Sequence, residues 1–187
     1  MSLHRALTAR LAVAGRRAFQ TSAAARVTAG QAVPATTLFN GSPGNAFPTA
    51  DLVPGSLLVF VPGAFSPACS ASHVPGYLGL ADEFAKAAVP HIYVVAVNDS
   101  FVVKSWAESL GAADDKRVTF LADPAGDLTA ALDLKFDAAK FFGNDRAKRS
   151  AVLLGADGAV RAAWVEPTST GVEDTAADKI LAAVKAL

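Results

Sequence analysis

Three short apolar runs, separated by longer amphipathic stretches, dominate the hydrophobic pattern of the chain. The runs cover residues 57–61, 92–97 and 118–121; each is rich in β-branched or aromatic residues and is bounded by turn-forming residues. Short apolar runs of this kind are typical of strands that are buried on both faces. The pattern therefore predicts three buried strands.

Stretches of helix-forming composition occupy residues 66–88, 100–110 and 127–132. Two apolar segments flank Gly-Ala-Asp-Gly at 155–158, which is typical of an antiparallel hairpin, and the amphipathic segment 174–187 predicts a final helix. Alternating strands and helices indicate an α/β fold in which helices flank a mixed central sheet. The thioredoxin-like fold is one such architecture, and periodicity alone does not choose among them.

The first 26 residues differ in composition from everything that follows. They contain five arginines, no acidic residue, scattered Ser and Thr, and apolar residues at helical spacing. This composition is typical of a mitochondrial transit peptide. We expect residues 1–26 to be removed on import and residues 27–187 to form a single domain in the mitochondrial matrix. The alternative is an Ala- and Arg-rich tail without a targeting role.

Length and charge narrow the classes of function. A chain of 187 residues is expected to hold one compact domain and an appendage. Because five of the 17 basic residues lie in the leader, the body carries twelve basic against 17 acidic residues, which argues against nucleic-acid binding. No run approaches the roughly 18 apolar residues of a membrane-spanning helix. We therefore expect a soluble protein without nucleic-acid or membrane partners.

Cys69 is the single cysteine of the chain. An intrachain disulfide, a CxxC redox pair and a multi-cysteine zinc site are therefore excluded, and a lone cysteine is often an inert buried residue. Here, however, Cys69 follows the first predicted strand and lies in the first turn of the helix expected from Ser66. Ser66 can cap this helix, and Pro67 suits its first position. The N-terminal end of a helix favours a thiolate, so this is a position suited to a nucleophile.

The sequence around Cys69 closely resembles the active-site motif of the peroxiredoxins, in particular the Prx5-like (type II) subfamily. The matching residues are Val61-Pro62-Gly63-Ala64-Phe65-Ser66-Pro67-Ala68-Cys69-Ser70 and His73-Val74-Pro75-Gly76. Further landmarks follow in the same order, namely Pro43-Gly44-Asn45, Val97-Asn98-Asp99, Leu121-Ala122-Asp123-Pro124, Phe142-Gly143-Asn144, Lys148-Arg149 and Val165-Glu166-Pro167. The resemblance implies a thioredoxin-like fold and a thiol peroxidase without a cofactor.

The resemblance also implies roles for four residues. Cys69 would attack the O–O bond of hydrogen peroxide or an organic hydroperoxide and become a sulfenic acid. Arg149 would place a positive charge and N–H donors beside the sulfur. Ser66 would bind the peroxide oxygens, and Pro62 would shield the sulfur from water. The subfamily more often has Thr at position 66, and Ser lacks the methyl group that restricts the Thr rotamer.

Other residues near the motif are weaker candidates. His73 is expected in the hydrogen-bond network of the site in a positioning role, and its alternative is a solvated surface histidine. Phe65, Phe141 and Phe142 can line an apolar entrance for organic hydroperoxides. For Phe141 and Phe142 the alternative is packing in the core. Arg146 reads as an ordinary solvated charge. The histidines cannot form a metal site with one cysteine, so no metal is expected.

The segment after Val165-Glu166-Pro167, where some family members carry a resolving cysteine, contains none here. The sulfenic acid would therefore be reduced by an external thiol, either glutathione with glutaredoxin or thioredoxin. The resemblance further implies a homodimer, with Phe101 and residues 73–77 as contributors to its interface.

Two other functions compete with peroxidase activity. A redox-sensing or chaperone-like binding protein would use oxidation of Cys69 as its signal. A disulfide exchanger of thioredoxin type is disfavoured because a second cysteine is missing.

Overall fold

Three parallel strands form the centre of the protein, whose computed structural model describes residues 27–187. They are β3 (Leu57–Val61), β4 (Ile92–Ala96) and β5 (Val118–Ala122), which confirms the three predicted strands within one residue at each end. β3 pairs with β4 and β4 pairs with β5, in parallel register.

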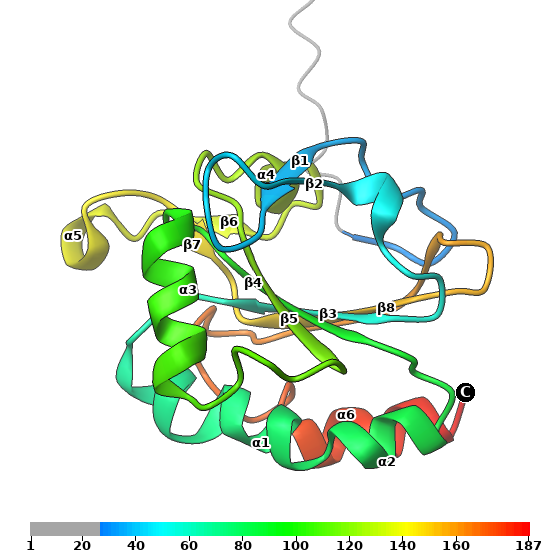
Figure 1. Cartoon of the computed structure of the whole chain (residues 1–187). Helices are drawn as coiled ribbons and strands as arrows, with labels where there is room; N and C mark the ends of the chain where they lie inside the picture. Colours follow the sequence, from blue (N-terminus) through cyan, green and yellow to red (C-terminus); the bar gives the residue numbers. More distant parts are fainter. Residues whose placement is uncertain (1–26) are drawn as a thin grey trace, which may run out of the picture.

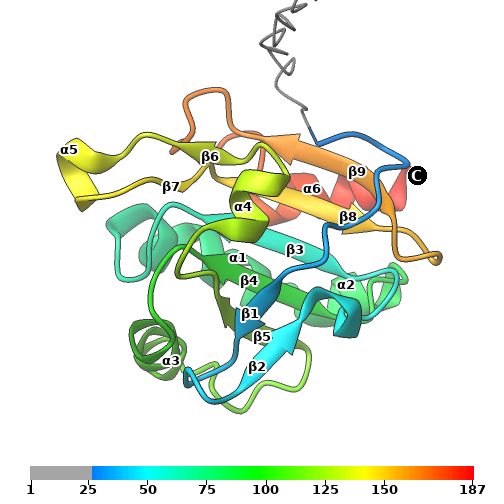
Figure 2. The same cartoon turned by 90° about the horizontal axis from the view of Figure 1, so that it is seen from above.

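Antiparallel strands extend this centre on both sides to give a mixed sheet of order β2-β1-β5-β4-β3-β8-β9 (Figure 2). The predicted hairpin is confirmed as β8 (Ser150–Leu154) and β9 (Val160–Val165), and β8 pairs with β3. At the other edge, β1 (Thr37–Phe39) and β2 (Ala46–Pro48) were not predicted. Three-residue strands are too short to show a period of two.

Helices cover both faces of the sheet (Figure 1). One face carries α1 (Val74–Gly79), α2 (Ala81–Lys86) and α6 (Ala177–Lys185), with α3 (Ser100–Ser109) beside them. The other face carries the short α4 (Asp127–Ala131) and the β1–β2 hairpin, which continues into a 3-10 turn, η1 (Thr49–Asp51). The final helix is shorter than the predicted 174–187.

The stretch of helix-forming composition at residues 66–88 forms more than one helical element in the structure. Helical backbone begins at Pro67, widens into a π-helical turn, η2 (Cys69–His73), and continues as α1 until a break at Leu80. At that break, Leu80 has φ −106° and ψ 10°, outside helical geometry. The helix-forming composition of residues 66–88 therefore corresponds to helical backbone over most of this range, and α2 (Ala81–Lys86) continues it after the break.

A small antiparallel pair, β6 (Lys135–Phe136) and β7 (Arg146–Ala147), forms an arm with α5 (Ala139–Phe142) between its strands. The arm extends away from the central sheet in both views (Figures 1 and 2). It was not predicted, because two-residue strands leave no periodic signal. The chain returns from this arm directly into β8.

Alternate residues of the central strands enter two separate cores. In β3, Leu57, Val59 and Val61 pack with the helices of the first face, whereas Leu58 and Phe60 pack with β1 and α4 on the other. All five residues of β3 are fully buried. This explains why β3 reads as a continuous apolar run, since both faces of the sheet exclude water.

Among residues 27–187, no helix is long and apolar enough to cross a membrane. The expected transit peptide, residues 1–26, lies outside the described residues.

Asp123, directly after β5, holds the start of α4. Its buried carboxylate accepts hydrogen bonds from the N–H groups of Asp127 and Thr129, both at 2.9 Å, and from the Thr129 hydroxyl at 2.7 Å. Asp123→Ala leaves these donors without a partner, so we expect the free energy of unfolding to fall by about 3 kcal/mol. Urea denaturation measures this loss. Asp114→Ala, at an exposed position, should unfold like the wild type, and equal midpoints for both variants would refute the assignment.

Candidate active site

Cys69 lies just beyond the C-terminal end of β3. The connecting loop contains the buried residues Pro62 and Gly63, and the helix that begins at Pro67 brings Cys69 into its first turn. Cys69 is fully buried. The N-terminal end of the helix therefore points its backbone N–H groups and its dipole towards the region of the sulfur.

Arg149 reaches Cys69 from the strand that neighbours β3. Because Phe60 pairs with Ser150 in antiparallel register, the preceding Arg149 lies level with the end of β3, where the cysteine loop starts. One guanidinium nitrogen, Nη1, is 3.3 Å from the Cys69 Sγ atom. The structure thus brings together two predicted site residues that are 80 positions apart in the chain.

The Arg149 side chain is held rigidly. It is 1% exposed, and its Nε and Nη2 atoms both donate to the carbonyl oxygen of Thr170 at 3.2 Å. In the described part of the chain, no carboxylate forms an ion pair with it. Its positive charge is therefore directed at the sulfur without a competing anion in contact.

Ser66 lies in the loop before Cys69, but it does not cap the helix as predicted. Its hydroxyl instead donates to the carbonyl oxygen of Gly63 at 2.9 Å. This bond closes the turn between Pro62 and the helix, and it leaves the lone pairs of the Ser66 oxygen available to accept a hydrogen bond.

The tight turn also constrains the residues around Gly63. A β carbon on Gly63 would lie 3.3 Å from the Phe142 ring, so glycine allows the α5 arm to pack against the loop. Phe65 adopts a φ of 59°, which is rare for a bulky residue and marks local strain beside the site.

His73 is buried, so the alternative of a surface histidine is wrong. Its Nε2 atom lies 3.2 Å from the Thr175 carbonyl oxygen, which also accepts a hydrogen bond from the Tyr77 hydroxyl at 2.7 Å. Burial and the positive charge of Arg149 lower the pKa of His73 to about 3. Because a carbonyl only accepts, the neutral imidazole carries its proton on Nε2. Its buried Nδ1 has no partner in the described residues.

The three phenylalanines occupy different environments. Phe141 is 80% exposed, so core packing is wrong for it, whereas Phe142 is half-buried and Phe65 is 53% exposed. Arg146 stacks over the Phe142 ring at 5.0 Å and donates through Nη1 to the Val97 carbonyl at 2.6 Å. The interpretation of Arg146 as a solvated charge was therefore wrong.

Sequence reasoning treated Glu166 only as a landmark and missed Thr175. Both are buried, and the Glu166 carboxylate accepts from the backbone N–H and the hydroxyl of Thr175 at 2.8 Å. Glu166 directly follows an apolar strand and precedes a proline. This position is the sequence signal that could have indicated a buried carboxylate that stabilises a loop.

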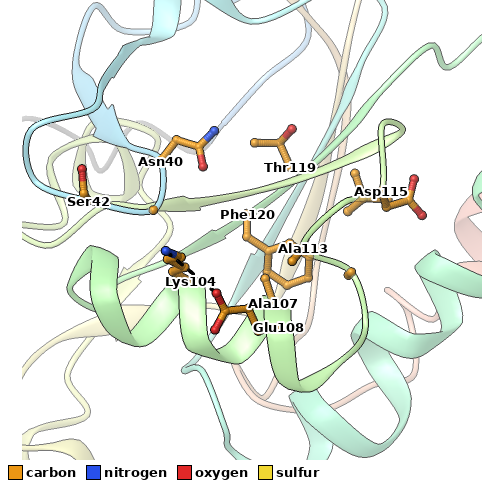
Figure 3. A pocket seen from close by; sticks show the side chains of 12 residues that line it. Asn40, Ser42, Lys104, Ala107, Glu108, Ala113, Asp115, Thr119 and Phe120 are labelled. Carbon is orange, nitrogen blue, oxygen red and sulfur yellow. Dashed lines mark ion pairs between the residues drawn. The ribbon is translucent and has the colours of Figure 1, made fainter.

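A separate cavity of about 380 Å³ lies between α3, β5 and the β1–β2 loop (Figure 3). Its rim carries Lys104 and Glu108, whose side chains form an ion pair at 3.9 Å. None of the predicted site residues lines it. This cavity is therefore separate from the Cys69 site.

Comparison with known proteins agrees with this geometry. The redoxin family model matches residues 28–181. The chain is 39% identical over 160 residues to "Peroxisomal membrane associated protein 20" of Schizosaccharomyces pombe, covering 84% of this chain and 99% of that protein.

Solved structures show the same likeness. Reduced Prx3 of Vibrio vulnificus in complex with hydrogen peroxide has a TM-score of 0.75 at 36% identity, over 84% of this chain and 99% of that one. Peroxiredoxin 5 of Alvinella pompejana has a TM-score of 0.75 at 29% identity, over 86% and 99% of the two chains. The chain belongs to the redoxin family and is a peroxiredoxin, a thiol-dependent peroxidase with a thioredoxin-like fold.

The buried His73 makes stability dependent on pH. Its pKa is about 3 in the folded state and near 6.5 when exposed, so below pH 6.5 the unfolded chain binds a proton that the folded chain does not. Stability should therefore fall by up to about 1.4 kcal/mol per pH unit as the pH drops below 6.5. His73→Gln retains an N–H donor without this proton. Urea denaturation between pH 7.5 and 4.5 should show a shallower decline for the variant, and identical slopes would contradict the assignment.

Proposed function

We propose that the protein reduces hydrogen peroxide and organic hydroperoxides through Cys69. The observation that carries this proposal is the 3.3 Å contact between Arg149 Nη1 and Cys69 Sγ, in a buried site at a helix N-terminus. The thiolate attacks one peroxide oxygen, the O–O bond breaks, and Cys69 becomes a sulfenic acid. The other oxygen leaves with the bonding electron pair, takes a proton, and departs as water or an alcohol.

Each neighbouring group supports one part of this step. The Arg149 charge stabilises the thiolate and the negative charge that develops on the departing oxygen. The Ser66 hydroxyl, whose proton is directed at Gly63, offers its lone pairs to the O–H of a peroxide. Pro62, buried at the end of β3, keeps water from the sulfur. His73 contributes as a neutral positioning group because its pKa lies far below neutrality.

The entrance to the site favours an apolar substituent on the peroxide. Phe65 is half exposed beside the cysteine loop, and Phe142 packs against Gly63 from the arm. The stacked Arg146 fixes the Phe142 ring in this place. These two apolar rings beside the cysteine loop are the groups that would accept the organic part of an alkyl hydroperoxide.

The reaction cycle is completed by an external thiol. Cys69 is the single cysteine of the chain, so its sulfenic acid has no intramolecular partner. A one-cysteine mechanism follows, in which the sulfenic acid condenses with one external thiol to a mixed disulfide and releases water. A second thiol then attacks this disulfide and releases the reduced enzyme, and the two thiols come from glutathione with glutaredoxin, or from thioredoxin.

We also propose a homodimer. Phe101, at the start of α3, is 61% exposed and supports an apolar contact with a second copy. In the segment 73–77, the second expected contributor to this interface, Pro75 and Gly76 are partly exposed, whereas the other three residues are buried.

A rapid-mixing experiment tests the peroxidase function. Reduced protein is mixed with equimolar hydrogen peroxide or organic hydroperoxide, and the mass of oxidised Cys69 is followed in time. We expect oxidation orders of magnitude faster than that of free cysteine, none in Cys69→Ser, and at least a roughly 100-fold slower reaction in Arg149→Ala. Wild-type oxidation at the rate of free cysteine would refute the function. Fast oxidation that no thiol reverses would instead support the redox sensor.

The arginine-rich leader supports import into mitochondria, although the relative from Schizosaccharomyces pombe carries a peroxisomal name. A fluorescent protein fused behind residues 1–26 should accumulate in mitochondria, because a positively charged amphipathic segment directs import. The matched fusion with Arg10, Arg16 and Arg17 replaced by Ser should stay outside. Peroxisomal or diffuse fluorescence of the unmodified fusion would contradict this location.

A further inference from the structure

A single loop, residues 166–175, contacts both the backbone and the side chain of Arg149. The backbone N–H of Arg149 donates to the Ser169 carbonyl at 2.7 Å, and its carbonyl accepts from the N–H of Glu166 at 2.9 Å. Its side chain donates twice to the Thr170 carbonyl, at 3.2 Å. Both the backbone and the guanidinium of Arg149 are therefore positioned by this loop.

Glu166 closes the loop on itself. Its carboxylate Oε1 accepts from both the N–H and the hydroxyl of Thr175, each at 2.8 Å. Glu166 is 3% exposed and Thr175 is fully buried. The loop passes so close that a β carbon on Gly171 would lie 3.1 Å from Oε2 of Glu166. A buried carboxylate is costly unless it is hydrogen-bonded, and these bonds supply that compensation.

The far end of the loop is fixed to the helix that carries Cys69. The Thr175 carbonyl accepts from the Tyr77 hydroxyl at 2.7 Å and from His73 Nε2 at 3.2 Å. His73 and Tyr77 follow Cys69 in the same helical segment, η2 and α1. The bonds of Thr175 thus connect the loop to the helix, and those of Thr170 connect it to Arg149.

The electrostatic arrangement matches this geometry. Burial raises the pKa of Tyr77, and the nearby charge of Glu166 raises it further. Within the described residues, however, Glu166 forms no ion pair with Arg149. The guanidinium is oriented instead by the neutral carbonyl of Thr170. The arginine charge is therefore directed at the sulfur, while the Glu166 carboxylate stabilises the loop without contacting the guanidinium.

We propose that Glu166 is a positioning residue for the reaction of Cys69. Its carboxylate fixes loop 166–175, and the loop holds the Arg149 guanidinium against the sulfur through the Thr170 carbonyl. This inference rests on the proposed peroxidase function. It predicts that Glu166 affects catalysis only through Arg149.

The test is a double-mutant cycle on the rate of Cys69 oxidation by hydrogen peroxide. Because misplacement of a reacting group by about 1 Å can cost about 100-fold in rate, we expect Glu166→Ala to slow oxidation by about 10- to 100-fold. Glu166→Gln, which keeps a carbonyl acceptor for Thr175, should recover most of the rate. Glu173→Ala, at an exposed position of the same loop, should match the wild type. In an Arg149→Ala background, Glu166→Ala should cause no further slowing.

Alkylation of Cys69 by iodoacetamide, measured in parallel, separates positioning from general damage to the site. Since alkylation needs no alignment of an O–O bond, Glu166→Ala should slow it less than it slows oxidation. Circular dichroism checks that each variant is folded. If Glu166→Ala does not fold, Thr175→Val, which removes one of the two bonds to Glu166, takes its place with an expected slowing of several fold that is absent in the Arg149→Ala background.

Three results would overturn the inference. Glu166→Ala could oxidise at the wild-type rate, or slow oxidation equally with and without Arg149, or slow alkylation as much as oxidation. A failure of the proposed peroxidase function gives a different result. In that case Cys69 of the wild type and of Glu173→Ala would both be oxidised no faster than free cysteine, and the inference would be refuted together with the function.

Discussion

The contact between the Arg149 guanidinium and the Cys69 sulfur is the constraint on which the rest of this site depends. Burying a guanidinium costs several kcal/mol unless its N–H groups find acceptors. Here the acceptors are the sulfur and the carbonyl of Thr170, and no carboxylate in the described residues shares the charge by direct contact. The protein therefore maintains a positive charge at one buried point, where a thiolate and a departing oxygen need it.

The central sheet makes this contact possible. β3 is buried on both faces and ends where the cysteine loop begins. β8 runs antiparallel to β3, so its first residue lies beside the end of β3. A parallel neighbour would have placed its first residues at the opposite end of the sheet. Antiparallel pairing of β8 thus brings Arg149 to Cys69 without a long connection, and the rigidity of the paired strands maintains their distance.

The surroundings of the contact are polar but largely neutral. His73 is uncharged because burial and Arg149 lower its pKa, and the one oxygen that accepts from the guanidinium in the described residues is the neutral Thr170 carbonyl. The buried carboxylate of Glu166 is used to tie the loop to Thr175. In a site of low dielectric, the separation of these roles keeps the field of Arg149 strong at the sulfur.

The sequence by itself determined the central strands, the hairpin of β8 and β9, and the position of Cys69 at a helix start, because these features leave local signals in apolar runs and turn residues. Resemblance supplied Arg149 as the partner of the cysteine. Only the tertiary structure decided the burial of His73, the role of the Ser66 hydroxyl, the α5 arm and the bonds of Glu166 to Thr175. The burial of His73 depends on a segment about 100 residues away, and the arm is built on very short elements. The bonds of Ser66 and Glu166 are closer in the chain but depend on how the loops fold, and none of these features leaves a periodic pattern.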